Sequence, residues 1–175
     1  MNNFFLPALT LVTGGAASGK SRFAEKLITD SELPRVYIAT AQAWDDEMRE
    51  KISQHRDRRD GWRDVEAPLD VVSALATVGH GEAALLDCLT MWLTNHLLAE
   101  SDLGRETRRL CDALTKCAGH VVVVTNEVGQ GIVPDNALSR QFREAQGRLN
   151  QHVAAQAQAV TVVMSGLPLT LKAPV

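Results

Sequence analysis

One short segment near the start of the chain restricts the possible folds more than any other feature of the sequence. It matches the pattern G-x-x-x-x-G-K-[ST], and its residues are Gly14, Gly15, Ala16, Ala17, Ser18, Gly19, Lys20 and Ser21. The apolar run 8–13 precedes it, and a segment with an apolar stripe, 21–29, follows it. This order predicts a phosphate-binding loop that joins a buried strand to a helix.

The residue types of this loop suit phosphate chemistry. Small residues let successive backbone N–H groups turn toward phosphate oxygens, and the following helix directs its positive end to the same place. Lys20 is expected to contact the β- and γ-phosphates, and the Ser21 hydroxyl to ligate Mg²⁺. The alternative, a chance match in a glycine-rich turn, does not account for the strand before it and the helix after it.

A carboxylate is also expected near the metal ion. Asp87 follows the apolar pair Leu85-Leu86 at the end of a predicted strand, where such a group is commonly found. The other interpretation is that Asp87 caps the helix that follows.

Apolar segments alternate with helical patterns along the whole chain. Strands are expected at residues 8–13, 36–40, 62–66, 83–88, 121–124 and, last along the chain, 159–164. Helices are expected at residues 21–29, 44–58, 69–78, 91–99, 105–118 and 139–158, with a loop at 127–135. This pattern predicts a single three-layer α/β domain of the P-loop NTPase type over residues 1–175, with a mostly parallel sheet and a short N-terminal tail at 1–7.

Composition excludes several classes of partner. The formal net charge is -3, and no long run of Lys and Arg is present, so we expect no nucleic-acid partner. No apolar stretch is long enough to span a membrane. The three cysteines form no C-x-x-C pair, which favours reduced thiols in a cytoplasmic protein over disulfides or a zinc site.

Among the five histidines, His55 has a distinctive context. It begins the cationic run His55-Arg56-Asp57-Arg58-Arg59, late in the predicted polar helix 44–58. Neighbouring cations would attract a triphosphate and keep the imidazole neutral and nucleophilic. The residues alone nevertheless favour a solvated charged helix over catalysis, because faces rich in charge are usually only solvated.

Short motifs that follow one another along the chain resemble those of a known enzyme family. After the phosphate loop and Arg22 come Tyr37-Ile38-Ala39-Thr40, Asp45-Asp46-Glu47-Met48, Ile52 with His55, Leu85-Leu86-Asp87-Cys88-Leu89-Thr90, Thr125-Asn126-Glu127-Val128-Gly129, Gly131-Ile132-Val133-Pro134, Arg140 with Phe142-Arg143, Gly147 with Asn150-Gln151, and Ser165-Gly166 with Pro168-Leu169. The series extends over nearly the whole chain. It resembles the bifunctional adenosylcobinamide kinase / adenosylcobinamide-phosphate guanylyltransferase family of cobalamin biosynthesis.

The resemblance implies two reactions. ATP or GTP would phosphorylate adenosylcobinamide, and GMP from GTP would pass through a covalent GMP-histidine to adenosylcobinamide phosphate. It assigns the guanylylated position to His55, which reverses the interpretation drawn from the residues alone. It also implies that the nucleotide is contacted by Ala39, Thr40, Ala41, Arg56, Asp57, Arg58, Arg59, Glu66 and Asp87.

Two other functions agree with the phosphate loop. A simple small-molecule or nucleotide kinase would use His55 only for its charge, and a nucleotide-sensing module would bind GTP without catalysis.

The resemblance further implies a homo-oligomer, a trimer, and a corrinoid as the small-molecule substrate.

Overall fold

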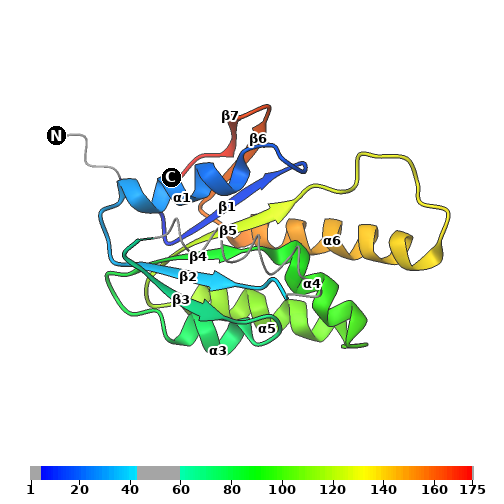
Figure 1. Ribbon diagram of the computed structural model, residues 1–175, viewed down its shortest axis with the longest axis horizontal. Helices are drawn as coiled ribbons and strands as arrows, with labels where there is room; N and C mark the ends of the chain where they lie inside the picture. The colour runs from blue at the N-terminus through cyan, green and yellow to red at the C-terminus, as the bar shows by residue number, and fades with distance from the viewer. Residues whose placement is uncertain (1–4, 43–59, 175) are drawn as a thin grey trace.

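The computed structural model describes residues 5–42 and 60–174, and a seven-stranded sheet forms their centre (Figure 1). The order of the strands across the sheet is β3-β2-β4-β5-β1-β6-β7. The strands are β1 (Leu9–Gly14), β2 (Arg35–Ala39), β3 (Trp62–Glu66), β4 (Ala83–Asp87), β5 (His120–Asn126), β6 (Ala159–Met164) and β7 (Leu167–Lys172). All neighbouring pairs are parallel except β6 and β7, which are antiparallel.

Helices cover both faces of this sheet. Figure 1 shows α1 on one side of the sheet and the other described helices on the opposite side. Helix α1 (Lys20–Asp30) lies on the first side and contacts β1, β4, β5 and β6. The second side carries α3 (Val71–Ala76), α4 (Leu89–Leu98), α5 (Leu103–Lys116) and α6 (Ala137–Gln156). The three-layer α/β architecture expected from the sequence is therefore confirmed.

Alternation along the strands builds a separate core on each face. In β4, Ala83 and Leu85 pack with Ala24 and Ile28 of α1, whereas Ala84 and Leu86 belong to the larger cluster under the other helices. The interior strands are apolar at nearly every position because both of their faces are buried. As a result, the direction in which a side chain points from these strands follows from its place in the alternation.

The strand predicted at residues 159–164 is confirmed as β6, but it is not the last strand, because β7 follows it as the antiparallel edge of the sheet. Pro168 lies inside β7, and proline usually argues against a strand. It is tolerated here because an edge strand has one side without a ladder of hydrogen bonds. The predicted helix 44–58 lies outside the described residues.

The predicted N-terminal tail is anchored from Leu6 onward. Leu6 is buried in the core beside α1, and the carbonyl of Pro7 lies 3.2 Å from Nδ1 of His120. His120 therefore links the start of β5 to the N-terminal segment. Within the described residues, no helix combines the length and the apolar composition that a membrane crossing requires.

Leu86 offers a direct test of the core. Its side chain lies in β4 and is fully buried, so Leu86→Ala is expected to lower the free energy of unfolding by about 2–5 kcal/mol. The matched control is Leu98→Ala, since Leu98 is 56% exposed and its loss should cost no more than about 0.5 kcal/mol. Urea unfolding measures both, and equal losses would contradict the assignment of Leu86 to the core.

Candidate functional site

The loop between β1 and α1 depends on glycine at two positions. A Cβ atom on Gly14 would lie 2.5 Å from the carbonyl oxygen of Val163 and 2.6 Å from Oγ of Ser18, which is closer than real Cβ atoms approach. Gly19 has a φ of 93°, a conformation that other residues rarely adopt. Ala17 also has a positive φ, of 53°. The loop therefore turns sharply between the end of the strand and the start of the helix.

The N-terminus of α1 is left open toward this loop. Its N-cap residue is Gly19, which has no side chain to cap the first N–H groups, and the first turn contains no acidic residue. The free N–H groups and the helix dipole together favour an anion at this place. Nζ of Lys20 lies at the same position and donates to the carbonyl of Gly15 at 3.0 Å.

The hairpin between β6 and β7 supports the loop from the other side. The backbone N–H of Gly166 donates to the carbonyl of Ser18 at 2.9 Å, and Ser165 and Gly166 both have positive φ, as a tight hairpin turn requires. Sequence reasoning assigned no role to this turn. Its signal was the Ser165-Gly166 pair itself, which follows an apolar strand.

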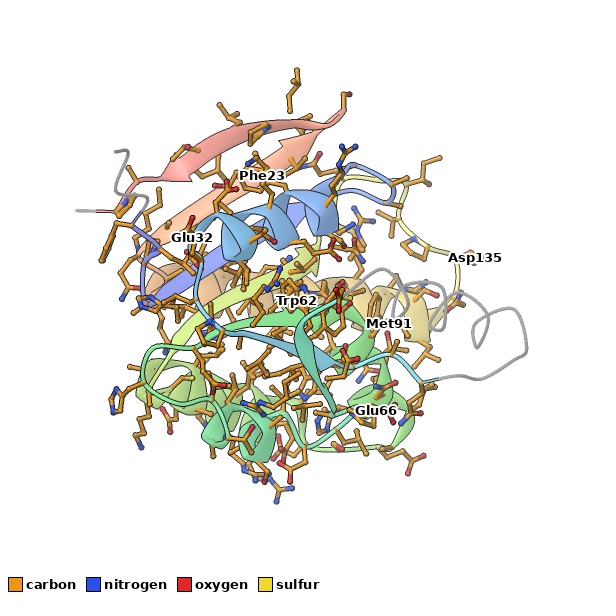
Figure 2. The ribbon with its side chains drawn as sticks, turned by 60° about the vertical axis from the view of Figure 1, so that its left-hand side comes forward. Phe23, Glu32, Trp62, Glu66, Met91 and Asp135 are labelled. Carbon is orange, nitrogen blue, oxygen red and sulfur yellow. The ribbon has the colours of Figure 1, made fainter. Side chains whose placement is uncertain are left out.

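The strand ends beside the loop bring three of the expected site residues into one row. In the sheet register, Ala39 of β2 pairs with Asp87 of β4 on one side and with Glu66 of β3 on the other. Figure 2 shows Glu66 on the side of the molecule away from Glu32, which follows the far end of α1. Ligands of parallel α/β sheets bind at this carboxyl edge.

Asp87 is held by a neighbouring strand. The hydroxyl of Tyr37 in β2 donates to Oδ2 of Asp87 at 2.9 Å. The N-cap of α4 is Cys88, so Asp87 does not cap that helix, and the second interpretation offered by the sequence was wrong. Tyr37 was missed as a positioning residue, although it belongs to one of the motifs that carry the family resemblance.

Thr40 is used entirely within the protein. Its side chain is buried, and Oγ1 donates to the carbonyl of Cys88 at 2.7 Å while accepting from the Cys88 N–H at 2.8 Å. Its backbone N–H donates to the carbonyl of Asp87, and its own carbonyl accepts from the amide of Asn95. These contacts favour a role for Thr40 in fixing the ends of β2 and β4 rather than in contacting a ligand.

Cys88 does not have the properties of a nucleophile. Burial raises the pKa of its thiol, and the negative charge of the adjacent Asp87 raises this pKa further. A thiol in this state remains protonated near neutral pH and is unreactive.

The other expected site residues are placed as follows. Ala41 follows β2 at the edge of the described segment and is partly exposed. His55, Arg56, Asp57, Arg58 and Arg59 lie outside the described residues. Of the histidines that are described, His80 and His152 are exposed, whereas His96 is buried and contacts Ser101 through Nδ1.

Two side chains in this region carry oxygen atoms of the kind that a magnesium ion binds. Ser21 lies in the first turn of α1, and Asp87 ends β4, two strands away from the loop. Hydroxyl and carboxylate oxygens are the hard ligands that Mg²⁺ prefers, so the residues present fit the expected metal. In the described part of the chain, no group of three or more His, Cys, Asp or Glu side chains that could hold a metal ion occurs.

Solved structures share this fold at low sequence identity. A Pyrococcus horikoshii OT3 protein superposes with a TM-score of 0.57 and 8% identity over 97% of this chain and 89% of its own. The flagellar accessory protein FlaH of Methanocaldococcus jannaschii gives a TM-score of 0.51 and 10% identity over 97% of this chain and 80% of its own.

The loop, the open helix end and the parallel strands beside them define a P-loop protein of the α/β class. Within that class, residues 10–171 match the family described as cobinamide kinase / cobinamide phosphate guanyltransferase. The chain belongs to this family and is accordingly an enzyme, a kinase and guanylyltransferase.

Curated relatives agree with this assignment. The bifunctional adenosylcobalamin biosynthesis protein CobP of Pseudomonas aeruginosa is 44% identical over 93% of this chain and 96% of its own length. The proteins of the same description named CobU are 44% identical in Salmonella typhimurium, over 94% of this chain and 99% of the relative, and 42% identical in Escherichia coli, with the same coverage.

Gly14 provides a test of the loop geometry. The Cβ atom of Gly14→Ala has no space between Val163 and Ser18, so the loop must shift and its N–H donors lose their alignment. We expect the dissociation constant for a non-hydrolysable GTP analogue to rise about tenfold or more, as measured by calorimetry.

The matched control for this test is Gly147→Ala on α6, where a Cβ atom meets nothing within 4 Å. It should bind the analogue normally and gain about 0.5–1 kcal/mol of stability, because alanine favours a helix over glycine. Unchanged affinity in Gly14→Ala would show that the loop does not hold the nucleotide.

Proposed function

We propose that this enzyme phosphorylates adenosylcobinamide with ATP or GTP and then transfers GMP from GTP to adenosylcobinamide phosphate through a covalent GMP on His55. Membership of the family supports the two activities. The observation that supports the nucleotide site most directly is the open N-terminus of α1, which faces the phosphate loop and has Lys20 beside it. The product would be adenosylcobinamide-GDP, an intermediate of cobalamin biosynthesis.

The phosphates would occupy the loop and the start of α1. Backbone N–H groups of residues 14–21 would donate to their oxygens, and Nζ of Lys20 would exchange the carbonyl of Gly15 for the β- and γ-phosphates. Further contacts would come from the neighbouring strand ends, through Ala39, Ala41 and Glu66. Arg56, Arg58 and Arg59 would add positive charge, since guanidinium groups bind phosphate oxygens bidentately.

Ser21 and Asp87 would hold a magnesium ion beside these phosphates. Bound Mg²⁺ neutralises charge on the phosphate oxygens of the nucleotide. Tyr37 would fix the orientation of the Asp87 carboxylate through the hydrogen bond that it already donates.

His55 would act as the nucleophile of the second reaction. A neutral ring nitrogen attacks the α-phosphorus of GTP, the bond from that phosphorus to the α,β-bridging oxygen breaks, and pyrophosphate leaves. A phosphate oxygen of adenosylcobinamide phosphate then attacks the same phosphorus, and the imidazole leaves in its original state. A difficult displacement is thereby divided into two easier ones.

A covalent adduct distinguishes this proposal from a simple kinase. When the purified enzyme is incubated with GTP and Mg²⁺, we expect its intact mass to increase by one GMP, on His55, in an acid-labile bond. ATP should give no adduct. Because the nucleophile is absent in His55→Ala, that variant should form no adduct and no GDP-linked product.

The matched control is His152→Ala, which removes an exposed histidine from the far end of α6 and should form the adduct normally. An adduct of normal yield on His55→Ala would exclude His55 as the nucleophile. No adduct on the wild-type enzyme, at a GTP concentration where binding is demonstrated, would favour the simple kinase.

Tyr37→Phe tests how Asp87 is positioned. Phenylalanine retains the edge-to-face contact of the ring with Trp62 but lacks the hydroxyl group that donates a hydrogen bond to Asp87. We expect the Mg²⁺ concentration for half-maximal activity to rise about tenfold or more, as for other partners of metal ligands. An unchanged Mg²⁺ requirement would contradict a metal role for the Asp87 carboxylate that depends on Tyr37.

A further inference from the structure

We propose that Asn126, the last residue of β5, contacts the terminal phosphoryl group of the bound nucleotide and assists its transfer. The inference rests on the proposed nucleotide site and gives a role to the motif Thr125-Asn126-Glu127-Val128-Gly129, which that site leaves unused. Its NH₂ group would donate to an oxygen of the γ-phosphate.

The sheet places Asn126 between the phosphate loop and the metal ligand. Strand β5 lies between β1 and β4, so its carboxyl end separates the start of the loop from Asp87. In register, Asn126 pairs with Gly14, whereas Asp87 pairs with Val124, two residues earlier in β5. Asn126 therefore extends past Asp87 and is level with the first residue of the loop.

The alternation of β5 directs the Asn126 side chain to the face that carries α1. Val124 and Val122, two and four residues before it, pack in the cluster that contains Ala24 and Ile28 of α1. Thr125 points to the opposite face and bonds to side chains of α6. Asn126 consequently shares its face with the open helix end rather than with α6.

Both polar groups of the Asn126 backbone form hydrogen bonds. Its N–H donates to Oγ1 of Thr90 in α4 at 2.9 Å, and its carbonyl accepts from Nδ2 of Asn150 in α6 at 3.1 Å. The next N–H, of Glu127, donates to the carbonyl of Gly14 at 3.0 Å. These three bonds lock the end of β5 to the loop and to two helices.

The side-chain amide of Asn126 has an unmet need for a partner. Its Oδ1 atom is buried, and no atom of the described residues forms a hydrogen bond with it. Leaving such a group unsatisfied costs about 1–3 kcal/mol, so stability alone does not account for an amide at this position. A half-turn of the amide exchanges its donor and acceptor ends, and the proposed contact uses the arrangement in which the NH₂ group is the end that meets the γ-phosphate.

The proposed contact favours the kinase reaction over guanylyl transfer. In the first reaction the acceptor oxygen bonds to the γ-phosphorus, the bond to the β,γ-bridging oxygen breaks, the nucleoside diphosphate leaves, and the hydroxyl proton passes to water. In the second reaction the attacked atom is the α-phosphorus, and the γ-phosphate remains within the departing pyrophosphate. Loss of the Asn126 amide should therefore impair the first reaction more strongly.

Binding measurements test the contact without relying on catalysis. With Mg²⁺ present, we expect Asn126→Ala to raise the dissociation constant for a non-hydrolysable GTP analogue about tenfold and to leave that for GDP unchanged, since one charge-assisted hydrogen bond is lost. The matched control is Gln156→Ala, which removes an exposed amide at the far end of α6 and should change neither constant. Equal affinities of Asn126→Ala and wild type for the analogue would overturn the proposal.

Kinetics supply the second readout. The kcat for phosphorylation of the corrinoid should fall about 10²–10³-fold in Asn126→Ala, as when one preorganised donor is removed. Formation of the GMP adduct should fall less than about tenfold by the same comparison. Parallel loss of both reactions together with equal loss of GDP and analogue binding would indicate a purely structural role and overturn the proposal.

Failure of the wild-type enzyme to act on the corrinoid would reject the proposed function, whereas the ratio of analogue to GDP affinity would still decide the role of Asn126.

Discussion

Gly14 lies so close to β6 that a hydrogen atom is the largest substituent its Cα accepts on that side. This contact fixes where β1 stops and the loop begins. The loop then rests on the β6–β7 turn through the bond from Gly166 to Ser18, and α1 starts with its first N–H groups uncapped. An anion-binding place thus arises from backbone geometry alone, and Lys20 adds its charge to a site already formed.

The parallel sheet determines which side chains join this place. Neighbouring parallel strands end at one edge, and the observed register puts Glu66, Ala39 and Asp87 in a single row. The alternation of side chains along each strand then determines the face of the sheet to which each side chain points. Tyr37 belongs to the core cluster on the α1 side, and Asp87 lies two residues after Leu85 of the same cluster. The hydrogen bond that the Tyr37 hydroxyl donates to Asp87 holds the carboxylate at the carboxyl edge of the sheet. Fold and site are therefore coupled, because the register that pairs the buried strands also determines which residues end together at this edge.

Much of the site could be predicted because local rules govern it. The spacing of Gly14, Gly19 and Lys20 defines the loop, and an aspartate that ends an apolar strand is readily recognised. Other features depend on long-range contacts. β7 contains Pro168, whose tolerance follows only from its place at the sheet edge. The burial of Thr40 against Cys88, and the partners of Asn126 on α4 and α6, involve residues 24–48 positions apart in the chain, and no local pattern reveals them.

The core next to the end of β5 contains a network of hydrogen-bonded amide side chains. Gln146 of α6 is fully buried, and its Nε2 donates to both Thr125 and Asn150, yet its Oε1 has no hydrogen-bond partner in the described part of the chain. An apolar residue of similar size would avoid this desolvation cost, so stability alone does not account for the network. Hydrogen bonds are directional whereas apolar contacts are not, and here they orient Asn150 toward the carbonyl of Asn126. The network gives up some stability and in return fixes the strand end that borders the phosphate loop.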